Sequence, residues 1–444
     1  MSPLTADFRT VAGQSGGMVS LVAVGLAALL VGTEAFFTAL SVLNLRHEES
    51  TVEAEREWVT EELGVEDPDE LLDYNRATTG LSLLKQWLTL LVVLIVLFSG
   101  VFADAVAALQ GTGWPLPVQA AVFFGGAIVA AQLFDVPFDL VNTFVVEEIW
   151  GFNNQSLGLW ARDLVVGTVL GAVLAVPLLT AVVWFVGSVP YWPAAAWALF
   201  VGFVLAMQIL KPRVIDPLFY DFTKIEEGEL RDAVDDVFER AGFVCEQVYE
   251  MDYSSRSGHS NAYFVGFGRT KRVVLFDTLV EDMSLDEIQS VLAHELAHWK
   301  RNHIWKFVGL AAVRFAVVFA VLGYLVGANW LYAPVWAPET AYAGLALAFL
   351  LVAPFQRLTS PLDNYLSLKY EREADAFAAD TVGGDSMADA LANLASENLA
   401  SLFPHPWYET FHYDHPPIPE RMRRMREFAG SDATNDESGP QPAD

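Results

Sequence analysis

The sequence predicts an all-α polytopic membrane protein, in which seven transmembrane helices are interrupted by one large polar insertion. The chain has 444 residues and 53% of them are hydrophobic, which is too apolar and too long for one ordinary soluble domain. Apolar segments of about 20 residues are long enough to cross a bilayer as helices. Seven such segments are present: Met18–Leu45, Trp87–Leu109, Pro117–Asn142, Leu164–Val186, Trp192–Leu210, Ile304–Val326 and Ala341–Phe355.

These spans divide the chain into regions of different character. The last span is the weakest, because Pro354 is expected to interrupt its helix. The expected regions are a polar N-terminus (1–17), five spans with an acidic loop at 46–82 (18–210), a polar insertion (211–303), two spans (304–355), a C-terminal polar segment (356–429) and a disordered acidic tail (430–444).

The distribution of Lys and Arg predicts the orientation. The polar residues 1–17 do not resemble a signal peptide, so the first span is expected to be retained. The loops near 110–116, 187–191 and 327–340 contain no Lys or Arg, whereas the polar segments 46–86, 211–303 and 356–429 carry most of them. The positive-inside rule therefore predicts an external N-terminus, with the insertion and the C-terminus in the cytoplasm.

Charge and cysteine content exclude several classes of function. The net charge is −29, which argues against nucleic acid as a partner and fits either loop solubility or high-salt surroundings. Cys245 is the only cysteine, so the chain has no disulfide framework and no cysteine-based metal site.

The insertion is expected to contain helices and a small β-hairpin. "EEGELRDAVDDVFERAG" predicts a helix that ends at Gly242. "NAYFVGF" and "RVVLFDTLV" alternate like strands, and the Gly-Arg-Thr turn at 268–270 between them predicts a hairpin. "SLDEIQSVLAHELAHWK" predicts a helix whose Ser284 and Glu287 form a capping box.

Polar side chains also occur inside the predicted spans. Each is costly against lipid, so we expect these residues to pair between helices or to face a hydrated interior. They are Glu34, Gln132, Asp135, Asp139, Asn142, Gln208 and Arg314.

The motif "HELAH" predicts a catalytic zinc site. Residues i and i+4 of a helix lie on one face, so His294 and His298 can bind the same ion. Glu295 lies beside them and can act as the general base on a zinc-activated water. This is the pattern of a zinc endopeptidase.

A catalytic zinc needs a third protein ligand, and spacing leaves several candidates open: Glu371, Glu373, Asp375, His303, His405, His412 and His415. Glu371 and Asp375 share one face of a predicted helix, so one can bind zinc while the other orients a ligand histidine. Glu373 is expected to point away as a solvated charge, and His303 to have a structural or capping role.

Several motifs together resemble one known family. "HSNAYFVGFGRTKRVVLFDTLV", "HELAHWKRNH", "YEREADAFAAD" and "HYDHPPIPER" follow one another as in the type I CAAX prenyl endopeptidases, the integral-membrane zinc metalloproteases of the yeast a-factor-processing type. "FNNQSLGLWARD" and "DPLFYDFTKIEEGELR" also resemble that family. One departure is Leu368, which stands where the family often has an arginine.

The resemblance implies a role for each matching residue. It implies zinc ligands at His294, His298 and Glu371, with Glu295 as the catalytic glutamate. It further implies that Asp375 supports a ligand histidine, that Asn261 lies near the substrate backbone, and that His415 and Arg421 lie near the scissile bond and the oxyanion. The family fold is a ring of seven transmembrane helices around a water-filled chamber.

The expected function is a monomeric, membrane-embedded endopeptidase with one Zn²⁺, which cuts peptide or protein substrates near a prenylated C-terminal CAAX sequence and also contacts membrane lipid. The substrate is expected to lie along the strand at 261–267. One alternative is a quality-control protease of the HtpX type with no lipid requirement, although its members are shorter and have fewer spans. Another is a membrane scaffold with a decayed site, against which the intact His294, Glu295, His298 and Glu371 set argues.

Overall fold

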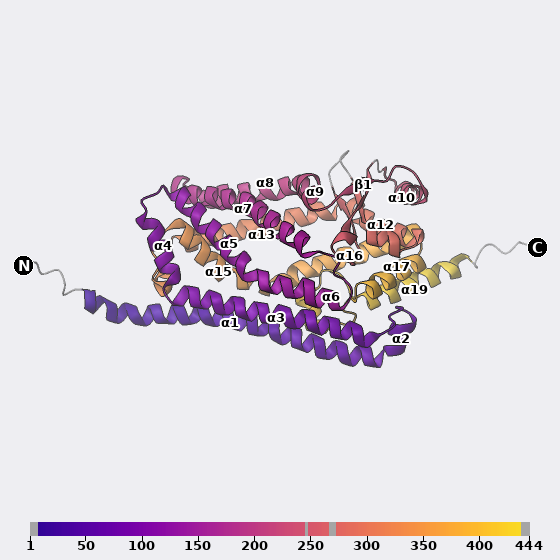
Figure 1. Ribbon diagram of the computed structural model, residues 1–444, viewed down its shortest axis with the longest axis horizontal. Coiled ribbons are helices and arrows are strands. Elements are labelled where there is room, and N and C mark those ends of the chain that lie inside the picture. The colour runs from indigo at the N-terminus through magenta and orange to yellow at the C-terminus, as the bar shows by residue number, and fades with distance from the viewer. Residues whose placement is uncertain (1–7, 245–246, 266–271, 437–444) are drawn as a thin grey trace, which may run out of the picture.

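The computed structural model describes residues 8–244, 247–265 and 272–436, and it is almost entirely helical (Figure 1). The helices of the spans are α1 (Phe8–Ala54), α3 (Pro68–Phe98), α5 (Leu116–Val141), α7 (Leu157–Ser188), α8 (Trp192–Leu210), α13 (His303–Val326) and α15 (Ala341–Leu358). The polar helices that carry or cover the candidate site are α10 (Glu229–Arg240), α11 (Asp277–Asp282), α12 (Leu285–Lys300), α16 (Ser360–Val382), α17 (Gly384–Glu397), α18 (Pro406–His412) and α19 (Ile418–Asp436). Short connecting helices are α2 (Arg56–Glu61), α4 (Val101–Gly111), α6 (Glu147–Ile149), α9 (Asp216–Phe219) and α14 (Asn329–Tyr332), with π-helical turns at Asn142–Val146 and Lys211–Ile215 and 3₁₀ turns at Tyr253–Ser255 and Ala333–Val335.

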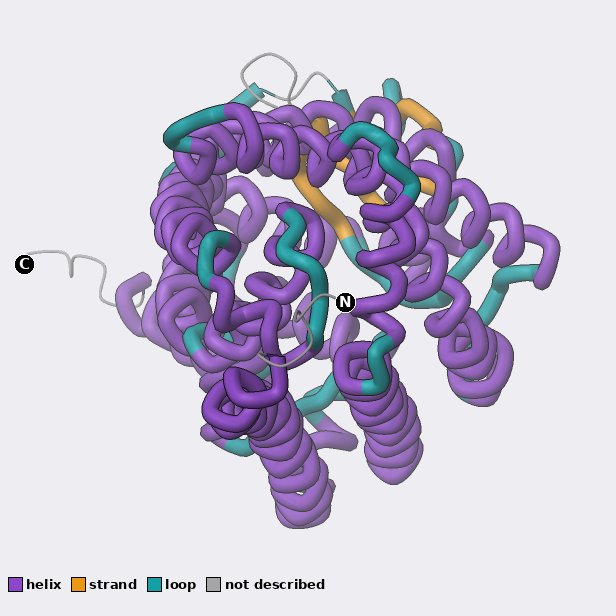
Figure 2. Tube along the Cα trace, turned by 90° about the vertical axis from the view of Figure 1, so that its left-hand side faces the viewer, coloured by secondary structure: helices purple, strands orange, loops and turns teal. Residues whose placement is uncertain are grey.

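The prediction of seven spans is confirmed, since seven of the described helices are long and apolar enough to cross a membrane. These helices form a ring, which Figure 2 shows end-on. Contacts pass from α1 to α3, through α4 to α5, and on to α7, α8, α13 and α15, and α15 contacts α1 again. Between Trp160 and Val182, α7 has no buried side chain. A helix inside a solid bundle buries a continuous stripe, so the ring is one helix thick along this stretch.

Two apolar cores close the two ends of the ring. One gathers Phe102 of α4, Trp192 of α8 and Tyr342 of α15 at the end where α4 lies. The other joins the ends of α1 and α3 to α10, α12, α17 and α19 at the opposite end. The polar helices are thereby fixed against one mouth of the ring. The water-filled chamber inside the ring stays a prediction.

Several expected boundaries differ from the structure. The second span, expected at Trp87–Leu109, is α3, which ends at Phe98; Gly100 then turns the chain at φ 94° into the separate helix α4. The acidic loop at 46–82 is mostly helix, because α1 continues to Ala54 and α3 begins at Pro68. Apolar composition marks only the lipid-facing length of a helix, and both helices extend beyond it.

Further differences concern the two ends of the chain and one proline. Pro354 does not interrupt α15, which runs through it to Leu358. Helix α1 begins at Phe8, inside the expected polar terminus. Residues 430–436 of the expected disordered tail continue α19 as helix, and residues 437–444 lie outside the described residues.

Most of the charges inside the spans pair between helices, which is one of the two arrangements that the sequence left open. Glu34 of α1 pairs with Arg357 of α15 at 2.8 Å, and Asp135 of α5 pairs with Lys85 of α3 at 3.0 Å. Asp139 accepts a hydrogen bond from the indole of Trp160 at 2.8 Å. Arg314 of α13 pairs with Asp363 near the start of α16. These contacts offset the cost of placing charge at membrane depth.

The predicted hairpin is confirmed and belongs to a larger sheet, but its second strand is shorter than expected, because "DTLV" after Phe276 begins the helix α11. Strands β3 (Ala262–Val265) and β4 (Arg272–Phe276) pair antiparallel with Ala262 opposite Leu275, and the turn at 268–270 lies outside the described residues. β2 (Val248–Met251) runs parallel to β4, and β1 (Phe222–Lys224) completes the order β1-β2-β4-β3. β3 is therefore an edge strand beside α12, which it contacts.

Candidate metal centre

Helix α12 fixes the direction of the two predicted ligand histidines. The capping box is present, because the Ser284 hydroxyl accepts from the Glu287 amide and the Glu287 carboxylate accepts from the Ser284 amide. Ile288, Leu292 and Leu296 follow one another at four-residue spacing and are buried in the core. With that face buried, the adjacent face presents His294 and His298 to α16, along which α12 packs.

Three potential ligand atoms converge between α12 and α16. His294 Nε2 and His298 Nε2 lie 3.3 Å apart, and Glu371 oxygens lie 3.1 Å and 3.3 Å from them. Within the described part of the chain, this is the group that can hold a metal. Among the candidates for the third ligand, Glu371 is thus the one favoured by its position beside the two Nε2 atoms.

The donor set fits a metal ion such as zinc. Two ligands at about 2.05 Å from Zn²⁺, separated by the tetrahedral angle, lie about 3.3 Å apart, which matches the distance between the two Nε2 atoms. Glu371 Oε2 is buried, and despite its proximity to His294 it has no hydrogen-bond partner of acceptable geometry. A buried carboxylate oxygen in this state is costly unless a cation faces it.

His294 lies against Asp375, the residue that the resemblance implies as the support of a ligand histidine. Its Nδ1 lies 2.9 Å from Asp375 Oδ1, so the Nδ1 proton points at the carboxylate and the Nε2 lone pair points at the centre. Arg421 holds the same carboxylate through two hydrogen bonds of 2.9 Å and 2.6 Å. Burial would raise the pKa of Asp375, but the charge of Arg421 and the hydrogen bonds keep that pKa well below its usual range.

The two candidate ligand histidines differ in their proton affinity without metal. Burial would lower the pKa of His294, but the nearby carboxylates of Asp375 and Glu371 raise it to about 9. Burial lowers the pKa of His298 to about 4. At neutral pH His298 is therefore already in the neutral form that metal binding requires, whereas His294 must release a proton.

Glu373 is not the solvated charge that the sequence predicted. Its Oε2 lies 3.3 Å from His303 Nε2 and 3.5 Å from Arg301 Nη1. The structural role predicted for His303 is supported, since the residue is fully buried and its ring stacks on Tyr370 at 4.2 Å. Helical spacing predicted that Glu373 lies on a different side of α16 from Glu371. It could not predict that α13 supplies His303 as a partner on that side.

Glu295 and His415 both lie at the centre. Burial raises the pKa of Glu295, whose side chain is half-buried beside the ligand cluster. His415 Nε2 lies 3.3 Å from Glu371 Oε2, and its Nδ1 lies 2.9 Å from Asp414. Burial would lower the pKa of His415, but the Asp414 hydrogen bond and the charge of Glu371 raise it.

Asn261 lies at the start of the edge strand. The residue is exposed, its backbone carbonyl accepts from the Phe276 amide at 3.1 Å, and its side chain accepts from the Ala262 amide at 2.8 Å. Residues 266 and 267 of the predicted substrate strand lie outside the described residues. The remaining histidine candidates belong elsewhere: His405 caps α18, and His412 stacks on Tyr408.

Comparisons with known proteins agree with this arrangement. Residues 224–429 match the model of peptidase family M48, and residues 52–221 match the CAAX prenyl protease N-terminal model of five membrane helices. The CAAX prenyl protease 1 homolog of Oryza sativa subsp. japonica is 36% identical over 69% of this chain and 72% of its own length. The CAAX prenyl protease 1 of Saccharomyces cerevisiae is 32% identical over the same shares.

A solved structure extends the likeness to the whole fold. The crystal structure of S. mikatae Ste24p matches with a TM-score of 0.81 and 26% identity, covering 91% of this chain and 98% of that one. The match includes the spans and the polar helices together.

Proposed function

The chain belongs to the CAAX prenyl protease 1 family of membrane-embedded metalloendopeptidases, and from this premise we propose that it binds one Zn²⁺ and cuts prenylated CAAX-type substrates. The observation that carries the proposal is the convergence of His294, His298 and Glu371, with a buried Glu371 oxygen that lacks a hydrogen-bond partner. The ring of spans closes within one chain, which supports a monomer as the working unit.

His294, His298 and Glu371 would hold the metal through two imidazole nitrogens and one carboxylate. When bound, the zinc supplies Lewis-acid chemistry, polarising the scissile carbonyl and making the adjacent water more acidic. Asp375 keeps the Nδ1 proton of His294 directed away from the centre. Arg421 acts mainly through Asp375, because two of its nitrogens donate to that carboxylate.

Glu295 is the general base in this proposal. Its carboxylate takes a proton from the attacking water and later gives it to the leaving amine. A half-buried carboxyl with a raised pKa is suited to both steps, since its affinity for a proton is closer to neutrality than that of an exposed glutamate. His415, when protonated, can donate its Nε2–H to the oxyanion that develops on the carbonyl.

The edge strand β3 supplies a surface for the peptide. An extended chain can add to an open sheet edge through backbone hydrogen bonds, and β3 contacts α12, the helix that carries Glu295. Asn261, exposed at the start of β3, would then contact the substrate backbone.

Replacement of the base tests the catalytic assignment. We expect Glu295→Gln to lower peptide hydrolysis by at least about 100-fold while the zinc content stays unchanged. Glu281→Gln, which alters an exposed carboxylate of α11, is the matched control and should keep full activity. Hydrolysis that persists in Glu295→Gln would remove Glu295 from the mechanism.

A pair of peptides tests the substrate. A farnesylated peptide ending in a CAAX sequence and its unmodified twin are offered to the purified protein at equal concentration. We expect the farnesylated peptide to be cut with the higher kcat/KM. Equal turnover would instead identify a quality-control protease with no lipid requirement, the alternative raised by the sequence.

A further inference from the structure

A metal-binding histidine needs a hydrogen-bond acceptor for its second ring nitrogen, because that bond fixes the tautomer and the ring orientation. Asp375 provides the acceptor for His294. For His298 the nearest candidate is another histidine: His303 Nδ1 lies 3.3 Å from His298 Nδ1. His303 is five positions further along the chain, at the first position of α13.

The placement of protons around this pair has one consistent solution. If His298 Nε2 is committed to the metal, its proton lies on Nδ1, and His303 Nδ1 must accept it. The proton of His303 then lies on its Nε2, which faces Glu373 Oε2 at 3.3 Å. Each ring nitrogen of His298 and His303 thus faces a partner of the matching kind, and the series ends at the Glu373 carboxylate.

The position of His303 is fixed by its surroundings. Asn302 takes a left-handed conformation (φ 57°), which Asn tolerates better than most residues, and this turn joins α12 to α13, which contact each other. The fully buried His303 ring lies nearly parallel to Tyr370, at 15°. Tyr370 precedes the predicted ligand Glu371, so the same segment holds both.

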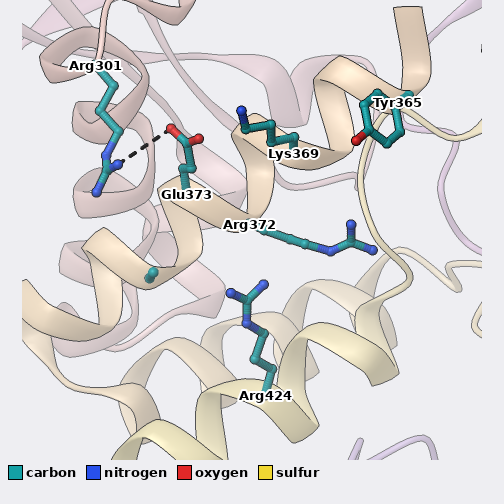
Figure 3. Close-up of a pocket in the computed structure, with 7 residues that line it drawn as sticks. Arg301, Tyr365, Lys369, Arg372, Glu373 and Arg424 are labelled. Atoms are coloured by element: carbon teal, nitrogen blue, oxygen red, sulfur yellow. Dashed lines mark hydrogen bonds and ion pairs between the residues drawn. The ribbon is translucent and has the colours of Figure 1, made fainter. Parts of the chain in front are cut away.

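Glu373, the last group in this series of hydrogen bonds, pairs with Arg301. Figure 3 shows its carboxylate directed at Arg301, with which it pairs at 3.5 Å. The two residues lie at the edge of a hollow of about 400 Å³ whose other charged lining residues are Lys369, Arg372 and Arg424. The charge of Arg301 favours a Glu373 carboxylate that stays in place as an acceptor.

We propose that His303 is a positioning residue that orients the ligand His298, with Glu373 and Arg301 supporting it from behind. The inference rests on the proposed metal site. It gives both ligand histidines the same kind of support: His294 is backed by Asp375 and Arg421, and His298 by His303, Glu373 and Arg301. Three acidic residues at alternate positions of α16 then have three different roles. Glu371 is a ligand, Asp375 supports His294, and Glu373 supports His298.

The test compares two substitutions of His303 in the full-length protein in detergent. His303→Phe keeps a ring against Tyr370 but removes the acceptor. His303→Gln keeps an oxygen that can accept from His298 and an amide that can donate to Glu373. The readouts are the Zn²⁺ dissociation constant of the metal-free protein, measured against a chromophoric chelator, and the visible spectrum of the Co²⁺-loaded protein.

We expect His303→Phe to weaken Zn²⁺ binding by about 10- to 100-fold and to shift the Co²⁺ bands, and His303→Gln to restore both. His412→Phe is the matched control, because His412 also stacks on a tyrosine, at 3.9 Å, and lies outside the ligand cluster. Its Zn²⁺ affinity should equal that of the unmodified protein.

Two results would overturn the proposal: Zn²⁺ binding by His303→Phe that matches the unmodified protein, or binding by His303→Gln that is as weak as that of His303→Phe. If His303→Phe does not fold, Glu373→Ala is used instead, because Glu373 is only half-buried. An unchanged Zn²⁺ affinity of Glu373→Ala then counts against the proposal. An unmodified protein that binds no Zn²⁺ would overturn the proposed function itself, which separates the two failures.

Discussion

Arg421→Met tests how much the buried pair behind His294 contributes to stability. The guanidinium donates to both oxygens of Asp375, at 2.9 Å and 2.6 Å. The Asp375 side chain is 1% exposed and that of Arg421 is 10% exposed. Methionine has a similar length but no donors, so the substitution leaves Asp375 buried with His294 as its remaining partner.

Removal of one partner from a buried ion pair costs about 3–5 kcal/mol, because the other charge stays desolvated. Without metal the protonated His294 still faces Asp375, so we expect a loss in the lower part of this range. Addition of Asp375→Asn to Arg421→Met removes that charge while keeping an acceptor for His294. The double variant should therefore be more stable than Arg421→Met alone. Neighbours that share hydrogen bonds show coupling energies of about 0.5–3 kcal/mol, which sets the size of the expected recovery.

The assay is denaturant unfolding of the metal-free protein in mild detergent, followed by tryptophan fluorescence. Arg423→Met is the control on the same helix: its guanidinium pairs with Glu55 at 3.0 Å but is half exposed, so its loss should cost about 0–1 kcal/mol. A loss below about 1 kcal/mol for Arg421→Met, or no recovery in the double variant, would refute the reasoning.

Three further predictions concern the metal, one carboxyl at the end of a helix and the orientation. Metal removal by a chelator should lower the thermal midpoint of unfolding, since a ligand at 100 times its Kd stabilises the folded state by about 2.7 kcal/mol; a midpoint independent of Zn²⁺ contradicts the site. Burial, with a smaller contribution from Asp282, raises the pKa of Glu397, the last residue of α17, so ionisation of this carboxyl destabilises the fold. Because solvent screens this exposed carboxyl, Glu397→Gln should stabilise the protein at pH 7 by only a few tenths of a kcal/mol, about 0.3 kcal/mol, and the gain should disappear as the pH falls below the unfolded-state pKa of about 4.3; a lower midpoint at pH 7 counts against this. In a Cys245→Ser background, an impermeant maleimide should label Trp336→Cys, in the exposed loop after α14, from the outside of sealed right-side-out vesicles and label Glu57→Cys only after permeabilisation; the reverse pattern rejects the orientation.

Local sequence signals were reliable where one element decides the outcome. The lengths of apolar segments predicted seven spans, since a bilayer accepts few other solutions. Ser284 and Glu287 predicted the start of α12, because a capping box involves only four consecutive residues. The four-residue spacings in His294–His298 and Glu371–Asp375 predicted which side chains share a helix face. Roles such as base, oxyanion donor and substrate contact stay predictions.

Local signals failed where the outcome depends on a neighbouring element. Glu373 was expected to be solvated, and only the packing of α13 beside α16 gives it His303 as a partner. The second span ends at Phe98 because the chain turns at Gly100, although apolar residues continue beyond it. The predicted hairpin gained β2 as a parallel neighbour of β4, a pairing between segments that are not adjacent in the chain.

The amino-acid sequence by itself determined the number of spans, the helix that carries two imidazoles, and the set of residues from which a third ligand could come. The tertiary structure decided which member of that set lies beside the two imidazoles, because Glu371 reaches His294 and His298 only when α16 packs along α12. Periodicity records which face of a helix is apolar, whereas the partner of that face depends on the packing of the whole chain.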